Sequence, residues 1–105
     1  MPNIQFNYLY RDAANYKNYG FLVFNNLEKL DLKPLEILIK SKLIDSQFFV
    51  ANDWQVTHLH FENWDEQTDH TWHEFESVEF TSKPSNTLLK LAEFVSLIEN
   101  TNPVY

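Results

Sequence analysis

The stretch IQFNYLY, residues 4–10, alternates its side chains with a period of two, which is typical of a half-buried strand. Its large apolar and aromatic side chains share one face, and Gln5, Asn7 and Leu9 share the other. Residues 11–18 break the pattern and indicate a turn. The apolar run FLVF at 21–24 then predicts a second strand. Residues 4–25 therefore predict a hairpin with a long loop.

Two segments with helical spacing lie further along the chain. Asp31 is a candidate N-cap for the first, because leucine and isoleucine recur every three or four residues from 35 to 43. Pro84-Ser85 would open the second, with Ser85 as its cap, and Asn102-Pro103 would end it. Each helix would present one apolar stripe, so both need a surface to cover.

Three further strands are predicted, at residues 47–51, 55–61 and 72–81. The alternation of the last one slips between Phe75 and Val78, which indicates a bulge. The polar residues 63–71 would form a loop. The order strand-strand-helix-strand-strand-strand-helix predicts an α+β fold, a mostly antiparallel sheet of four to five strands with two helices on one face. The length of 105 residues predicts a single globular domain, residues 1–105.

The charge is distributed unevenly along the chain. Residues 43–82 contain nine acidic residues and no lysine or arginine, whereas the remaining residues carry a net charge of +2. All three tryptophans and all four histidines also lie in this acidic part. Such a division does not determine a fold, but it indicates where a partner would be selected.

Composition excludes several classes of protein. The chain has no cysteine, which excludes disulfides, thiolate zinc sites and cysteine nucleophiles. A single glycine, Gly20, excludes the glycine-rich phosphate loops. The first residues lack a basic start followed by an apolar run, so we expect no secretory signal. No apolar stretch approaches the roughly 20 residues of a membrane helix. We therefore expect a cytoplasmic protein without membrane contact.

The histidines form the first candidate site. His58 and His60 are two apart and would share one face of a strand, and His70 and His73 are three apart, as on a helical turn. Imidazoles beside carboxylates are usual ligands of zinc, nickel or iron. The alternative is that these histidines cap turns and pair with nearby acids. The sequence thus indicates no cofactor, or else a divalent transition metal at these four positions.

Arg11, the only arginine, forms the second candidate site together with Asp12. It lies among four tyrosines, and aromatic and basic side chains together can hold single-stranded nucleic acid. The net charge of −7 argues against that role, because it repels phosphates. The sequence favours an internal clamp, in which Arg11 pairs with a carboxylate from the acidic part of the chain.

General acid–base chemistry by His73 and Glu74, or by Asp69 and His70, would require a pocket that tunes their pKa values. No nucleophile motif surrounds any serine. The sequence therefore favours a protein that is not an enzyme.

The segment 58–79 is the third candidate site, because it interleaves acids with aromatic side chains. Trp64 and Trp72 would anchor a partner, and Asp65, Glu66 and Asp69 would steer it. The segment could bind a basic protein, or imitate the charge of nucleic acid toward a protein that binds it. The alternative is a solvated acidic surface over buried aromatic rings. We expect an interaction module with a basic or cationic protein partner, and a metal-binding, hydrolytic domain is the second hypothesis.

Three pieces of the chain resemble a family of small bacterial proteins of unknown function. They are YRDAANYKNYG at 10–20, LIDSQFFVA at 43–51 and DHTWHEFESVE at 69–79. In that family a glycine commonly stands where this chain has Ser46, which bears on the turn after Ile44. The resemblance implies a compact cytoplasmic bacterial protein, and it implies no activity, ligand or partner.

Overall fold

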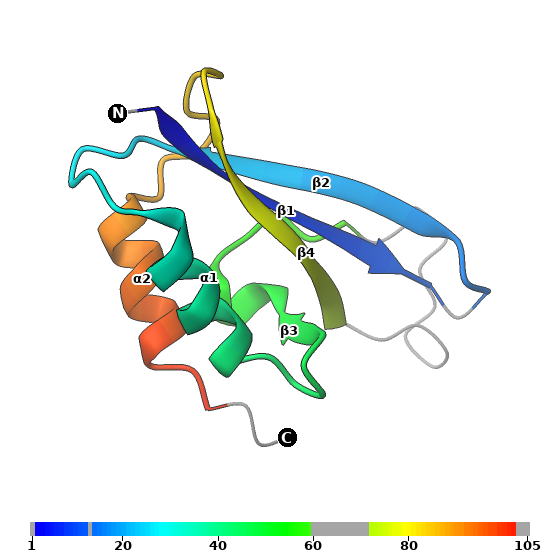
Figure 1. Ribbon diagram of the computed structural model, residues 1–105. Coiled ribbons are helices and arrows are strands. Elements are labelled where there is room, and N and C mark those ends of the chain that lie inside the picture. Colours follow the sequence, from blue (N-terminus) through cyan, green and yellow to red (C-terminus); the bar gives the residue numbers. More distant parts are fainter. Residues whose placement is uncertain (1, 13, 60–71, 103–105) are drawn as a thin grey trace.

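The computed structural model describes residues 2–12, 14–59 and 72–102 (Figure 1). The strands are β1 (Asn3–Arg11), β2 (Lys17–Phe24), β3 (Phe48–Val50) and β4 (Trp72–Thr81). The helices are α1 (Leu32–Ser41), the short 3-10 helix η1 (Ala51–Trp54) and α2 (Leu91–Glu99). The strands form one antiparallel sheet in the order β2-β1-β4-β3. The predicted α+β fold is therefore confirmed.

Both helices cover the same face of the sheet, the face of β1 that carries Ile4, Phe6 and Tyr8. Phe6 is central to this core: its ring centroid lies 5.2 Å from that of Phe94 in α2 and 5.7 Å from that of Phe49 in β3. The remaining core residues come from both helices and all four strands. The period of two in β1 thus selects the core face, and burial of aromatic area is the main stabilising term.

The predicted bulge in β4 is confirmed. Asn7 of β1 pairs with Ser77, but the next residue, Tyr8, pairs with Phe75, so Glu76 has no partner on β1. The extra residue allows Val78 and Phe75 to face the core on both sides of the bulge. It also leaves the carboxylate of Glu76 exposed.

The strand predicted at residues 55–61 is wrong over its described residues, 55–59, which are irregular. Gln55 ends η1 at a φ of 55° and turns the chain out of the direction of β3. The segment then binds to side chains instead of a neighbouring strand. The carbonyl of Thr57 accepts the hydroxyl of Tyr8 at 2.6 Å, and the carbonyl of Leu59 accepts Nδ2 of Asn18 at 2.9 Å.

The start predicted for the second helix is also wrong, because α2 begins at Leu91 and not at Ser85. Residues 84–87 run alongside β2, where Asn86 bonds the strand's backbone. Lys90 takes the N-cap position, and its N–H donates to the carboxylate of Glu93 at 3.1 Å. The predicted N-cap of the first helix, Asp31, does stand at that position.

The turn after Ile44 connects the end of the α1 region to β3. Its two central residues, Asp45 and Ser46, have φ values of 50° and 61°, as in the mirror-image turns of hairpins. The N–H of Gln47 closes the turn on the carbonyl of Ile44 at 3.0 Å. A serine therefore occupies a left-handed position, where glycine would be free of steric cost.

Candidate functional site

The sheet face turned away from the helices, here called the outer face, carries the side chains that alternate with the core residues. On β1 these are Gln5, Asn7, Leu9 and Arg11, because they lie between the positions that point into the core. The cross-strand registers add further members, among them Lys17, Tyr19, Phe21, Phe48, Trp72, Glu74, Ser77 and Glu79. Two half-exposed aromatic side chains, Tyr19 and Phe21, stand on it. The candidate site is built on this face.

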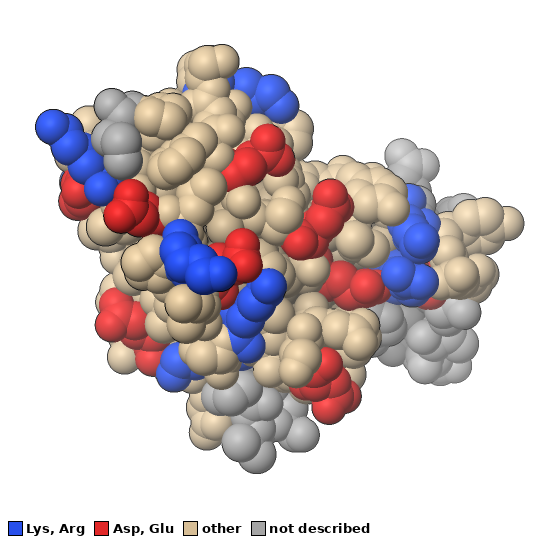
Figure 2. Space-filling model, viewed as in Figure 1, with Lys and Arg blue, Asp and Glu red and all other residues tan. Residues whose placement is uncertain are grey.

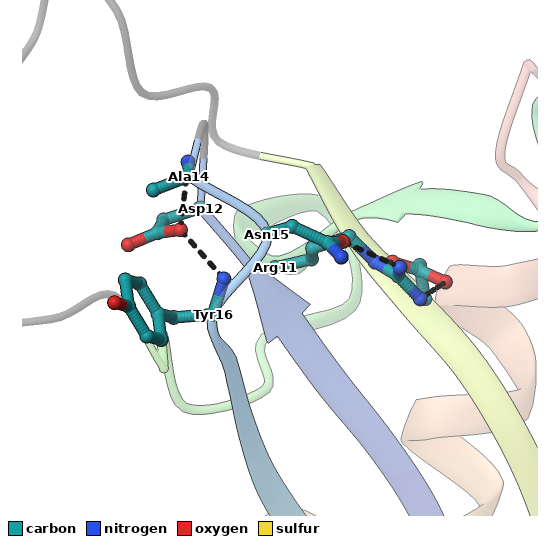
Figure 3. A network of polar contacts seen from close by, with 6 residues as sticks. Arg11, Asp12, Ala14, Asn15 and Tyr16 are labelled. Carbon is teal, nitrogen blue, oxygen red and sulfur yellow. Dashed lines mark hydrogen bonds and ion pairs between the residues drawn. The ribbon is translucent and has the colours of Figure 1, made fainter.

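Arg11 and Glu74 form an ion pair across β1 and β4. The guanidinium Nε lies 2.8 Å from Oε2 of Glu74, and Nη2 lies 3.3 Å from Oε1. The third nitrogen, Nη1, donates to Oδ1 of Asn15 at 2.7 Å, and Figure 3 shows these two side chains pointing toward one another. The side chain of Arg11 is 37% exposed and that of Glu74 is 16% exposed. Arg11 therefore holds the hairpin turn against a strand of the acidic part of the chain.

Asp12, the other residue of the predicted clamp, bonds to the backbone of the turn that follows β1. Its Oδ1 accepts the backbone N–H groups of Ala14 and Tyr16, both at 2.9 Å (Figure 3). These bonds, with Asn15 at a φ of 68°, shape the turn between β1 and β2. Asp12 thus fixes the loop from which Asn15 reaches Arg11.

An aromatic pair lies beside the ion pair. The ring centroids of Phe48 in β3 and Trp72 in β4 are 5.7 Å apart, and both side chains are half-buried. Phe48 also lines a surface pocket of about 330 Å³ with Arg11, Gln47 and Glu74. The structure therefore brings one of the predicted anchors, Trp72, next to the predicted clamp. Phe48 was not predicted as part of a site, because only the strand register places it opposite Glu74.

A row of polar side chains crosses the middle of the outer face. Nδ2 of Asn7 donates to Oε2 of Glu79 at 2.7 Å and to Oγ of Ser77 at 3.0 Å. Nε2 of Gln5 donates to Oδ1 of Asn7 at 2.8 Å, while Oε1 of Gln5 is buried and accepts no hydrogen bond from a described residue. These amides orient the carboxylate of Glu79 without neutralising its charge.

Acidic side chains dominate β4. Glu74, Glu76 and Glu79 lie on this strand with no lysine or arginine among its residues, and Figure 2 shows acidic side chains over the region where Figure 1 draws β4. Of these three glutamates, only Glu74 forms an ion pair with a described residue. The other predicted partner-binding residues, Trp64, Asp65, Glu66 and Asp69, lie outside the described residues.

Two of the four predicted metal ligands come together on the other face of the sheet. The rings of His58 and His73 pack edge to face with centroids 4.6 Å apart, and the ring of Tyr10 lies within 6 Å of both. Nε2 of the fully buried His73 accepts the N–H of Leu59 at 2.9 Å, so this nitrogen is not free to bind a metal. Within residues 2–12, 14–59 and 72–102 no group of three potential ligands lies together. His60 and His70 lie outside these ranges.

A buried tyrosine adjoins the histidine pair. The ring of Tyr8 lies 5.8 Å from that of His73, and its side chain is 1% exposed. Burial raises the pKa of Tyr8 to about 12, because the phenolate would lose its hydration. Tyr8 is therefore neutral at physiological pH, and in this position it serves packing and the hydrogen bond to Thr57.

No protein family, curated protein or solved structure matches this chain. The resemblance of its three sequence pieces to a bacterial family stays a prediction. No helix in the described ranges has both the length and the apolar character needed to span a membrane.

Proposed function

We propose that this chain is a non-enzymatic protein-interaction module, and that its acidic, aromatic segment, residues 58–79, binds a basic protein partner. The observation that carries the proposal is the placement of Glu79 and Trp72 on the outer face of the sheet, away from the helices. A strand of a rigid sheet presents these side chains at fixed spacing, so a partner meets them without ordering them first.

In this proposal the acidic side chains attract the partner and the aromatic side chain supplies contact area. Glu76 and Glu79 carry charges that no lysine or arginine of the described residues neutralises, and they would attract a basic partner and increase its association rate. Trp72, half-buried against Phe48, would supply apolar contact area at little cost in side-chain entropy. Arg11 would keep β4 and the hairpin turn in register and would not itself contact the partner.

The proposal is tested by capture of partners from a bacterial lysate with the folded chain as bait. Glu79→Lys and Trp72→Ala test the described strand, and Asp69→Lys and Trp64→Ala test the rest of the segment. Glu99→Lys is the matched control, because it makes the same change in net charge at the exposed end of α2. Circular dichroism verifies that each variant is folded.

The expected result is a basic protein that the parent and Glu99→Lys retain and that the segment variants lose. Its retention should weaken as salt increases, since exposed charges are screened within about 10 Å at 0.1 M ionic strength. A partner that all variants retain equally well would contradict the proposal.

A second candidate function, metal binding with hydrolytic activity, draws on the contact between His58 and His73. The engaged Nε2 of His73 weakens this candidate, because only its Nδ1 could then serve as a ligand. We propose mass spectrometry of the unchelated protein and calorimetric titration with zinc and nickel as the test. One metal per chain that is lost in His70→Ala and His73→Ala would favour this function, and the absence of metal and of heat would exclude these two metals.

A further inference from the structure

β2 is an edge strand of the sheet, and among the described residues only Asn86 bonds to its backbone groups that face away from β1. Asn86 bonds Val23 in the way that a residue of an adjacent strand would. Its Oδ1 accepts the N–H of Val23 at 2.7 Å, and its own N–H donates to the carbonyl of Val23 at 3.3 Å. Its Nδ2 also donates to the carbonyl of Phe21 at 3.2 Å. The backbone groups of Val23 therefore face away from β1.

The backbone groups of every second residue of β2 face away from β1, as those of Val23 do. Backbone groups alternate sides along a strand, so the N–H and carbonyl groups of Tyr19 and Lys17 also face outward, together with the N–H of Phe21. No hydrogen bond to these outward groups occurs among the described residues. With respect to the described residues, 17–21 thus form an open edge, which is a ready template for an added strand.

Side chains beside the open edge favour one kind of added strand. Tyr19 is 60% exposed and Phe21 is 42% exposed, so they offer aromatic area on the outer face. Nζ of Lys83 lies 4.6 Å above the ring of Phe21, and Lys17 stands at the other end of the edge. Neither lysine forms an ion pair with a described residue. Figure 2 shows basic side chains at the end where Figure 1 draws the turn between β1 and β2.

We propose that the open edge, residues 17–21, binds an extended acidic segment of a partner protein by strand addition. The partner's backbone would bond to Tyr19 and Phe21, and its alternate side chains would lie over the outer face. Acids placed four residues apart would meet the two lysines, since four residues span roughly 13 Å of strand. This edge is separate from the acidic strand β4, because β1 lies between them, so the inference does not depend on the proposed function.

A synthetic peptide tests the inference directly. The probe is Thr-Glu-Thr-Tyr-Thr-Glu-Thr with blocked ends, because its glutamates are four apart and its tyrosine would stand opposite Tyr19. Its binding to the full chain is measured by fluorescence polarisation and by the amide signals of Tyr19 and Phe21 in nuclear magnetic resonance. The expected result is saturable binding, with shifts at these two amides larger than at Val23, whose N–H already has a partner.

Two variants separate charge from backbone pairing. Lys17→Glu should weaken binding of this peptide and favour its analogue with lysine in place of glutamate, whereas the exposed Lys33→Glu on α1 should change neither. Tyr19→Pro removes an outward N–H, which an edge strand tolerates, and it should abolish binding while the thermal melt stays cooperative.

Three results would overturn the inference. One is the absence of saturable binding at millimolar peptide, and another is equal binding of the acidic and basic peptides. The third is a parent chain that is already a dimer by light scattering and loses dimerisation in Tyr19→Pro, because a second copy would then occupy the edge.

Discussion

Removal of the Arg11 side chain should destabilise the fold by about 1–2 kcal/mol. An exposed ion pair contributes roughly 0.2–1 kcal/mol, and breaking a fully buried one costs roughly 3–5 kcal/mol. Arg11 and Glu74 lie between these limits, at 37% and 16% exposure of their side chains, and they share two hydrogen bonds. Arg11→Ala also removes the donor to Asn15. The solvent contact of the guanidinium thus lowers the cost below that of a buried pair.

Thermal and urea unfolding of Arg11→Ala, Glu74→Ala and the double variant measure the coupling. A loss of 1 kcal/mol lowers the Tm of a domain near this size by roughly 4–8 °C. The double-mutant cycle should give a coupling of about 1 kcal/mol, reduced at high salt. Lys40→Ala is the control, because its pair with Glu36 on α1 is more exposed and should contribute only about 0.3–0.5 kcal/mol. Arg11→Ala with the stability of the parent would refute the clamp.

Three further predictions concern the turn after Ile44, the buried tyrosine and the single glycine. Ser46→Gly should stabilise the fold by about 0.5–1 kcal/mol in urea unfolding, because Ser46 has a φ of 61°. Burial raises the pKa of Tyr8 to about 12, so the contribution of the neutral tyrosine to the free energy of unfolding is complete below pH 10 and is lost as the pH rises to 12. That loss is at most about 3 kcal/mol, since one pKa unit corresponds to about 1.4 kcal/mol. Alkaline melts of Tyr8→Phe should lack that loss. Gly20→Ala should lower the Tm by a few degrees, because its Cβ would lie 2.8 Å from the Leu59 side chain, which must move.

The core and the order of most elements follow from local patterns in the sequence. The period of two in β1 predicts which side chains meet the helices, and the slip in the alternation of β4 predicts the bulge at Glu76. Both are properties of neighbouring residues. The composition of residues 55–61 predicts a strand, but in the described part, 55–59, the backbone bonds the side chains of Tyr8, Asn18 and His73. Such long-range contacts have no signal in a single sequence.

In the candidate site, too, local sequence patterns predict the kind of residue involved, and long-range contacts decide its partner. Composition indicates that Arg11 needs a carboxylate, but nine acids in the central part of the chain were available, and only the register of β1 and β4 selects Glu74. The aromatic partner of Trp72 is likewise set by the short pairing of β3 with β4. The helix start predicted at Ser85 is wrong for a similar reason. Asn86 bonds the backbone of β2, a long-range contact that the local sequence does not indicate.

The most direct test of the central claim is the affinity of the captured partner for Glu79→Lys and for Glu99→Lys, measured by calorimetry at physiological salt. A like charge placed in a complementary interface costs more than 1 kcal/mol. The account predicts that Glu79→Lys weakens binding about tenfold or more, whereas Glu99→Lys stays within about twofold of the parent. Equal affinities of the two variants would contradict the assignment of the acidic strand β4 to partner binding.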